Sequence, residues 1–185
     1  MKEVYIVSIA RTPIGSFNGA LSSLTALDLG KVAIQKAMER AGINGDQVDE
    51  VIMGNVLSAN LGQAPARQVS ILAGIQNSAR ATTINKVCAS GLKSISLAAQ
   101  SIMLGDSDIV VAGGMESMSN SPFYLPSGRS GIRYGNGEII DAIVKDGLQD
   151  PYNKNMMGNT AELCASELKF TREQQDAYSV ESYTR

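Results

Sequence analysis

The sequence of 185 residues contains no histidine. This absence matters most for Cys88, which lies in the stretch NKVCASGLKS over residues 85–94. A histidine beside a thiol usually takes its proton and leaves a reactive thiolate. No residue of this sequence can activate Cys88 in that way.

Cysteine itself is scarce. Cys88 and Cys164 are the only two, and they do not form a C-x-x-C pair. Without histidine or such spacing they provide neither a disulfide framework nor a zinc site. We therefore expect two reduced thiols and no bound metal.

The sequence also lacks an excess of either charge. Sixteen Lys and Arg residues stand against 18 Asp and Glu, spread along the chain, so there is no basic stripe for nucleic acid. No apolar run approaches the length of a membrane span, and no cleavage pattern follows the short apolar run near the N-terminus. With 44% hydrophobic residues, we expect a soluble, cytoplasmic protein with a sizeable core and neither a nucleic-acid nor a membrane partner.

What the sequence does contain is an alternation of strand and helix patterns up to Gly114. A capping box at Thr25 and Asp28 opens the first helix, Pro65 opens the second, and the third covers residues 90–104. This third stretch is small or apolar on nearly every side, which predicts a helix buried all round. The predicted strands are EVYIVSIA (3–10), DEVIMGNVL (49–57), ATTINKV (81–87) and DIVVAGG (108–114). The order predicts an α/β layer with a parallel sheet and right-handed crossovers.

The character changes after Gly114, where a stretch rich in Ser, Gly, Asn and Pro carries no clear period. We expect an excursion from the layer, and we place a domain boundary between residues 117 and 118. Helical patterning returns at 161–169, where Cys164 belongs to an expected core stripe, and at 171–185, where Thr171 and Gln174 form a capping box. This last helix reaches Arg185 without a cap, as a cut chain would.

Cys88 is predicted to lie where a strand gives way to a helix. There its sulfur is close to the free N–H groups and the positive end of the helix dipole, which favour a thiolate. Ala89, Ser90 and Gly91 are small, so the turn can be tight and an acyl chain can approach closely. The alternative is a buried structural cysteine, since free cysteine is among the most buried residue types. The position favours a nucleophile.

Several motifs in the same order resemble the thiolase family. They are RTPIGSFNGAL (11–21), VCASG (87–91), VVAGGMESMS (110–119), VKDGLQDPYNK (144–154) and MGNTAE (157–162). The resemblance implies a layered α/β/α fold in which Cys88 accepts an acyl group. The reaction it implies is the condensation of two acetyl-CoA to acetoacetyl-CoA and CoA, and the reverse thiolysis, as in the acetyl-CoA C-acetyltransferase branch. No cofactor is implied beyond coenzyme A as part of substrate and product.

The resemblance also implies roles for residues near the end of the chain. Leu148 is expected to contact the pantetheine arm, and Met157 to line the acyl pocket; the alternative for both residues is simple packing. The family usually has a histidine immediately before that methionine, whereas this sequence has Met156. The departure places one polar contact of the CoA-binding region in question.

The same resemblance explains the missing histidine. In thiolases the histidine that activates the nucleophile, the second catalytic cysteine and one oxyanion site belong to the later half of the chain. Residues 1–117 would then be the N-terminal α/β layer and residues 118–185 the beginning of the loop domain. We expect a C-terminal half, as the same chain or a separate fragment, and a homodimer or homotetramer in the complete enzyme. By itself the chain is expected to be inactive.

Two alternatives stay open. A decarboxylating, ketoacyl synthase-like condensing enzyme would share the layered fold and the cysteine at a strand-to-helix turn. A non-catalytic assembly chain with a thiolase-like fold would account for the absence of histidine. The glycines of GGMES lack the spacing of a phosphate-binding loop, so we expect them to permit close packing behind the active site.

Overall fold

The capping box predicted at Thr25 opens the first helix, α1 (Ala26–Ala41), of the computed structural model, which describes residues 2–185. The Asp28 N–H donates to Thr25 Oγ1 over 3.2 Å, and the Thr25 N–H donates to Asp28 Oδ2 over 2.9 Å. These bonds satisfy backbone donors that a helix start leaves free, a contribution of about 1 kcal/mol. Hydrogen bonds from Thr25 also hold the pKa of Asp28 below its usual value.

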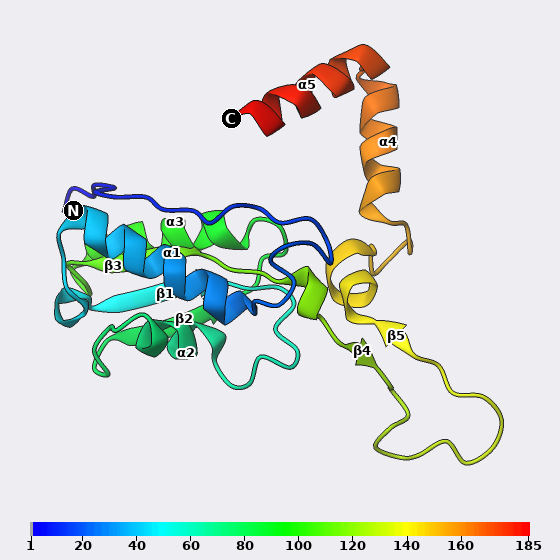
Figure 1. Ribbon diagram of the computed structural model, residues 1–185, viewed down its shortest axis with the longest axis horizontal. Coiled ribbons are helices and arrows are strands. Elements are labelled where there is room, and N and C mark those ends of the chain that lie inside the picture. Colours follow the sequence, from blue (N-terminus) through cyan, green and yellow to red (C-terminus); the bar gives the residue numbers. More distant parts are fainter. Residues whose placement is uncertain (1) are drawn as a thin grey trace. The chain divides into compact units, whose positions relative to one another are not determined.

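The predicted alternation continues through a parallel sheet and two more helices (Figure 1). The sheet order is β2-β1-β3, and both strand pairs are parallel, as predicted. Gly54, at the carboxyl end of β1, is level with Ile84 on one side and Gly114 on the other. The elements are β1 (Glu50–Gly54), α2 (Pro65–Leu72), β2 (Arg80–Ile84), α3 (Ser90–Leu104) and β3 (Val110–Gly114).

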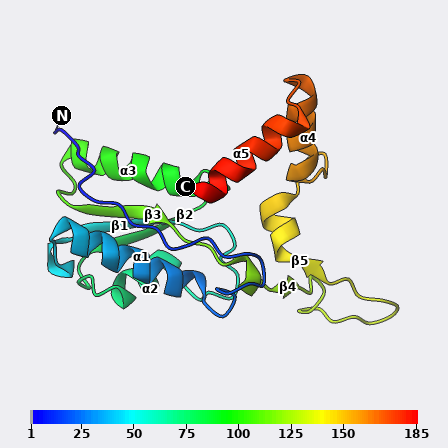
Figure 2. The ribbon, with the colours of Figure 1, turned by 45° about the horizontal axis from the view of Figure 1, so that its top comes forward.

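Helices lie on both sides of this sheet. Figure 2 shows α3 on one side and α1 and α2 on the other. A Cβ at Gly30 of α1 would lie 2.8 Å from Met115 Sδ and 3.1 Å from Val69 Cγ2, both closer than ordinary contact. Its absence lets α1 pack tightly. Buried apolar side chains between these helices and the sheet form the core, among them Ile34, Met38, Val48, Val51, Met53, Ala66, Val69 and Met115.

The expected excursion follows β3. A 3-10 turn, η2 (Met118–Asn120), leads to a short antiparallel hairpin of β4 (Phe123–Tyr124) and β5 (Ile140–Asp141). The Asn120 side chain donates to the carbonyls of Ser22 and Leu24, each over 2.9 Å. The start of the excursion is therefore tied to the loop that precedes α1.

The strand predicted at residues 3–10 is wrong. Within the described residues this segment pairs with no strand, and its apolar side chains are exposed, Ile6 to 74%. It is held by other contacts: Ser8 Oγ donates to the Ala37 carbonyl, and an Arg40 guanidinium N–H donates to the Ile9 carbonyl. A strand exists only with a hydrogen-bonding neighbour, which strand propensity alone does not supply.

The burial predicted for α3 is also wrong. The bounds agree with the prediction, but only Ser90, Ser94 and Ala98 are buried, and Leu92 is 73% exposed. One face packs on the sheet, and no described element of residues 2–143 covers the opposite face. The prediction that no apolar run approaches the length of a membrane span is also wrong. By length and composition, Val87–Leu104 could span a membrane, since it has 18 residues with a mean hydropathy of 1.3. Core helices of soluble proteins pass the same test, so this is weak evidence.

Contacts divide the chain into two units, of which the first ends at Ile143 and the second is Val144–Arg185. The boundary predicted between residues 117 and 118 lies inside the first unit, where the layer gives way to the excursion, and it stays a prediction. The second unit contains most of a π-helical turn, η3 (Ile143–Leu148), followed by α4 (Met157–Glu167) and α5 (Arg172–Thr184). Thr171 and Gln174 form the predicted capping box of α5.

Neither α4 nor α5 has a buried residue. The core stripe predicted around Cys164 is therefore wrong, since Cys164 is exposed and Leu163 and Leu168 are exposed beside it. An apolar stripe is buried only where another element packs on it, and nothing described does so within this unit.

Candidate active site at the carboxyl edge of the sheet

Cys88 lies in the turn between β2 and α3, at the carboxyl edge of the parallel sheet, as the sequence predicts. This edge is where open α/β sheets bind their ligands. Asn85 Oδ1 accepts from the Val87 N–H over 2.9 Å, which closes a tight turn. Ser90 Oγ accepts from the Lys86 N–H over 2.8 Å and donates to the Val87 carbonyl over 2.6 Å.

The turn is strained immediately before the cysteine. Val87 has a φ of 49°, in the left-handed region that a β-branched residue rarely adopts. Such a conformation costs on the order of 1–3 kcal/mol and persists only where the surroundings enforce it. Here the two hydrogen bonds of Ser90, which is buried, clamp the turn on both sides of Val87. Cys88 directly follows this strained residue and is exposed.

At the start of α3, some backbone N–H groups have no recorded partner among the described residues. The cap residue of α3 is Ala89, which has no side-chain oxygen to satisfy the first N–H groups of the helix. The Ala89, Ser90 and Lys93 N–H groups bond to carbonyls of the turn. Within the described residues, no hydrogen bond is recorded for the N–H groups of Cys88, Gly91 and Leu92. An oxyanion formed at Cys88 would find donors there.

The first turn of α3 lies directly on glycines of the neighbouring strands. A Cβ at Gly54 would come within 2.6 Å of the Ser90 carbonyl carbon, and one at Gly114 within 3.3 Å of Gly91 Cα. Ser94 Oγ donates to the Gly113 carbonyl over 2.7 Å. The prediction that the glycines of GGMES allow close packing is confirmed for Gly114, whereas a Cβ at Gly113 would make ordinary contact with Met53 Sδ at 3.7 Å.

A half-buried carboxylate lies at the same edge of the sheet. Glu116 accepts from the Val56 N–H over 2.9 Å, from the Leu57 N–H over 3.2 Å and from Asn55 Nδ2 over 2.8 Å. Burial raises the pKa of Glu116 above its usual value, and these hydrogen bonds oppose the rise. Asn55 is 3% exposed, and its Nδ2 also donates to the Met115 carbonyl. Its Oδ1 is buried without a partner in the described structure.

Sequence reasoning missed this cluster. The interpretation of the GGMES motif rests on its glycines alone. It gives no role to Glu116 or to Asn55. The available signal was an acidic residue two positions after a strand with no alternation, because a buried carboxylate there must be paired or hydrogen-bonded.

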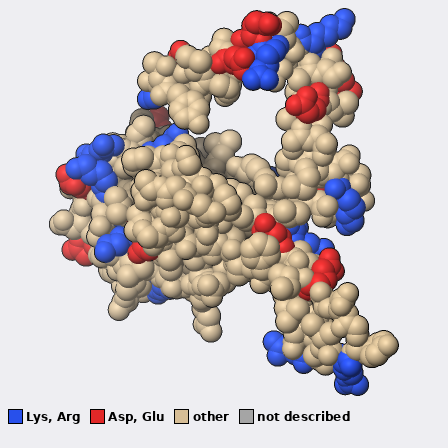
Figure 3. Space-filling view, turned by 45° about the vertical axis from the view of Figure 1, so that its right-hand side comes forward, with Lys and Arg blue, Asp and Glu red and all other residues tan. Residues whose placement is uncertain are grey.

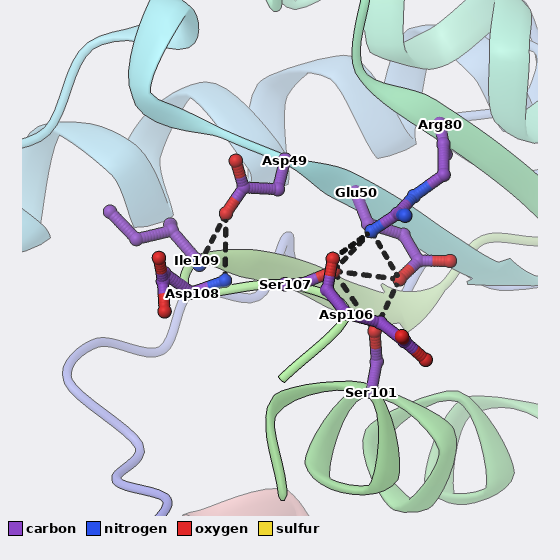
Figure 4. A network of polar contacts seen from close by, with 8 residues as sticks. All are labelled: Asp49, Glu50, Arg80, Ser101, Asp106, Ser107, Asp108 and Ile109. Carbon is purple, nitrogen blue, oxygen red and sulfur yellow. Dashed lines mark hydrogen bonds and ion pairs between the residues drawn. The ribbon is translucent and has the colours of Figure 1, made fainter. Parts of the chain in front are cut away.

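The opposite, amino edge of the sheet holds a second polar network (Figure 4). Asp49 Oδ2 accepts from the N–H groups of Asp108 and Ile109 over 2.8 and 2.9 Å, which lowers the pKa of Asp49. Glu50 accepts from Ser101 Oγ over 2.8 Å and lies 3.7 Å from the Arg80 guanidinium. These contacts join the first residues of the strands to the end of α3, far along the strands from Cys88, and they serve the fold.

Leu148 and Met157, the predicted substrate contacts, both lie in the second unit. The isolated antiparallel bridge between Gln149 and Met156 brings them to the base of one tight loop. Asp150 Oδ1 accepts from the N–H groups of Tyr152 and Asn153 and shapes that loop. Met157 begins α4 and is 38% exposed. The structure thus pairs Leu148 with Met157 in one unit and holds Cys88 in the other.

Positive and negative side chains are interspersed on the face drawn in Figure 3, where most of the surface is uncharged. Among residues 2–185, no group of three or more Cys, Asp and Glu side chains is placed to hold a metal ion. The chemical groups that the structure describes at this edge of the sheet are the Cys88 thiol, backbone N–H donors and the Glu116 carboxylate.

Comparison with known proteins gives the same picture. Acetyl-CoA acetyltransferase ERG10, cytosolic, from Gibberella zeae is 60% identical over 185 residues, and acetyl-CoA acetyltransferase 2 from Arabidopsis thaliana is 58% identical over 184. The crystal structure of Acat5 thiolase from Ascaris suum in complex with coenzyme A covers 99% of this chain with a TM-score of 0.92 and 49% identity. The chain spans about half the length of these relatives, 46–47%.

The family model for the thiolase N-terminal domain matches residues 4–185. The fold expected from the resemblance, a thiolase-like α/β structure, is confirmed by the structural match. The chain belongs to the thiolase family, of which it carries the N-terminal domain.

Proposed function

We propose that the protein carrying this chain is an acetyl-CoA C-acetyltransferase that condenses two acetyl-CoA to acetoacetyl-CoA and CoA, and catalyses the reverse thiolysis, through an acyl-enzyme on Cys88. The observation that carries the proposal is the exposed thiol in a strained strand-to-helix turn, next to unpaired N–H groups of a helix start. The names of the relatives support the same activity.

In the first half-reaction, the Cys88 thiolate attacks the carbonyl carbon of acetyl-CoA. The C–S bond to coenzyme A breaks, CoA leaves as a thiolate that takes up a proton, and a thioester forms on Cys88. The free N–H groups near Cys88 are suited to stabilise the oxyanion of the tetrahedral intermediate. Because one thioester replaces another, the exchange is nearly balanced in energy, and covalent catalysis splits one difficult reaction into two steps.

In the second half-reaction, another acetyl-CoA loses a proton from its α-carbon. The resulting carbanion attacks the Cys88 thioester, a C–C bond forms, and the Cys88 thiolate leaves. A general base must take the α-proton. No residue of this chain is assigned that role, in keeping with the expectation that it belongs to the later half of thiolases.

Leu148 and Met157 would serve the substrate, Leu148 against the pantetheine arm and Met157 against the acyl group. Their position at the base of one ordered loop supports a common role. Coenzyme A is needed only as part of substrate and product. The Ascaris suum relative is a thiolase in complex with coenzyme A, which supports an acyl-CoA substrate here.

We further propose a homo-oligomeric, cytoplasmic protein. The cytosolic Gibberella zeae relative supports this location, whereas a relative from Xenopus tropicalis, 58% identical, is mitochondrial. Fractionation of source cells with an antibody to this chain tests the location, and gel filtration with light scattering tests the assembly.

The activity is tested in the protein that contains this chain together with the part its relatives have beyond it. Thiolysis of acetoacetyl-CoA, followed by loss of the substrate's absorbance, should be abolished by Cys88→Ala and unaffected by Cys164→Ala. Release of carbon dioxide from malonyl-CoA would instead support the decarboxylating alternative. A folded protein that forms no acyl-enzyme with acetyl-CoA would support the non-catalytic one.

A further inference from the structure

The turn that carries Cys88 is held in place from the neighbouring strand, and a single carboxylate fixes the end of that strand. The Asn55 N–H donates to the Ile84 carbonyl over 3.0 Å, at the point where β2 ends and the Cys88 turn begins. At the other end of the turn, Ser90 and Gly91 lie against Gly54, too close for any side chain there. Both ends of the turn therefore take their position from residues 54 and 55.

Glu116 holds that segment. Its carboxylate accepts from the backbone N–H groups of Val56 and Leu57 and from the side chain of Asn55. The preceding residue, Met115, donates its N–H to the Gly54 carbonyl over 2.9 Å and accepts from Asn55 Nδ2 over 3.2 Å. Residues 54–57 are thus hydrogen-bonded to residues 115–116 through their backbone groups and through the side chain of Asn55.

We propose that Glu116 is a positioning residue for acyl transfer: by holding the carboxyl end of β1, it fixes the turn that presents Cys88 and the donors at the start of α3. The inference rests on the proposed function and adds to it a residue that does not touch the substrate. It concerns the rate of the chemical step rather than substrate binding.

The nature of the contacts supports a dedicated role. All recorded partners of the Glu116 carboxylate are N–H donors, and no ion pair with Lys or Arg is recorded for it among the described residues. Burial without a cation disfavours the charged form, as the raised pKa of Glu116 reflects. The group instead collects backbone donors that a loop after a parallel strand would otherwise leave to water.

The contacts also define the sharpest variant. In Glu116→Gln, the amide has one oxygen where the carboxylate has two. In one orientation the new amide oxygen accepts from the N–H groups of Val56 and Leu57, and its NH₂ then faces the NH₂ of Asn55. In the other orientation the oxygen accepts from Asn55, and the NH₂ of residue 116 then faces the backbone N–H groups. Either orientation opposes donor to donor.

The experiment measures kcat and KM for acetoacetyl-CoA thiolysis in the complete protein, with melting temperatures for every variant. We expect Glu116→Gln to lower kcat by about 10- to 100-fold, because displacing a reacting group by about 1 Å can cost about 100-fold in rate. KM should change by less than about threefold, since a positioning residue makes no contact with substrate. Glu138→Gln, an exposed glutamate of the excursion, is the matched control and should leave kcat unchanged.

A Glu116→Gln protein with a lower melting temperature but an unchanged kcat would overturn the inference and leave a merely structural role. A rise in KM equal to the fall in kcat/KM would also overturn it. If Glu116→Gln does not fold, kcat is measured for Asn55→Ala instead. This variant removes one hydrogen bond to Glu116, and an unchanged kcat would contradict the inference. An active wild-type protein that loses activity with Cys88→Ala, but not with Glu116→Gln, leaves the proposed function intact and rejects this inference alone. An inactive wild-type protein rejects both.

Discussion

Cys88 and Cys164 are both exposed, so accessibility alone does not separate them. Their surroundings do, because only Cys88 stands at the start of a helix with unpaired N–H groups beside it. Cys164 lies near the middle of α4, whose backbone N–H groups are bonded within the helix. We expect acetyl-CoA to acetylate Cys88 and not Cys164 in the complete protein.

Peptide mapping by mass spectrometry checks this expectation. Cys164→Ser should keep one acetyl group per chain, and Cys88→Ser should have none. Acetyl predominantly on the peptide containing Cys164 would contradict the assignment of the nucleophile.

Met157 is the residue at which a change should alter specificity rather than folding. It begins α4 and is 38% exposed, so Met157→Ala removes few packing contacts and should cost less than about 1 kcal/mol. If its side chain forms part of the acyl pocket, the variant should gain rate on longer 3-ketoacyl-CoA relative to acetoacetyl-CoA. The ratio of kcat/KM values for the two substrates measures this, and an equal loss of rate on both would count against a pocket role.

The candidate site was accessible to sequence reasoning only in part. Cys88 could be placed because a strand pattern, small residues and a helix pattern adjoin along the chain. Glu116 could not, because its partners are backbone groups of Val56 and Leu57, which only the pairing of β1 with β3 brings near. The roles of Leu148 and Met157 stay predictions.

At the scale of elements, the close packing of α3 on the sheet depends on Gly54. A Cβ there would lie 2.6 Å from the Ser90 carbonyl carbon and 2.8 Å from the Gly91 nitrogen, both backbone atoms. We expect Gly54→Ala to destabilise the protein by about 1–3 kcal/mol or more, because α3 must move away from β1.

Gly91→Ala is the matched control. A Cβ at Gly91 would meet its nearest atom, the Gly114 nitrogen, at 3.7 Å, which is ordinary contact. This variant should stay within about 1 kcal/mol of wild type. Urea denaturation followed by circular dichroism measures both, and equal stability of the two variants would contradict this account of the packing.

The loop before β3 depends on Asp49, whose effect should vary with pH. Its carboxylate accepts from the N–H groups of Asp108 and Ile109, and these bonds lower its pKa from 3.8. A lowered carboxyl pKa contributes stability that is present above pH 3.8 and is lost as the pH falls through the folded-state pKa. Asp49→Asn should therefore lower the free energy of unfolding by about 1–2 kcal/mol at pH 7.

The difference between Asp49→Asn and wild type should shrink below about pH 4. Urea titrations at a series of pH values measure it. Asp46→Asn, at an exposed aspartate with no partner recorded in the described structure, is the control and should show no such trend. A constant difference down to about pH 3 would mean that the charge of Asp49 is not what stabilises the loop.

Elements whose signals are local were predicted well. Thr25 and Pro65 define helix starts through their own backbone or side-chain chemistry, and the structure begins α1 and α2 at these positions. The strand at residues 3–10 and the burial of α3 and Cys164 were wrong, because each depends on a neighbour. Strand pairing and the covering of an apolar face are properties of the assembly around a segment and cannot be derived from its residues.

Across the whole molecule, large apolar side chains remain exposed on many stretches. Three of these stretches are formed by Tyr5, Ile6, Val7 and Ile9 on the N-terminal segment, Leu92, Ile95, Met103 and Leu104 on α3, and Leu163 and Leu168 at α4. Exposed apolar surface of this extent marks an interaction surface or an aggregation liability. Together with relatives about twice as long, it leads us to expect residues 1–185 alone to be poorly stable.

The same reasoning predicts the catalytic behaviour of the 185-residue chain by itself. The chain has no histidine to take the proton of Cys88 or of an α-carbon. General base catalysis contributes about 10²–10⁴-fold, and helix-start donors cannot replace it because they accept no proton.

We expect no measurable acetoacetyl-CoA thiolysis from residues 1–185, and recovery when the remaining part of the protein is supplied as a fusion or a second fragment. Mixing the second part with a Cys88→Ala chain is the control and should restore nothing. Robust turnover by a 185-residue preparation of verified mass, abolished by Cys88→Ala, would contradict the prediction and would place a catalytic base among the Lys, Asp, Glu or Tyr residues of this chain.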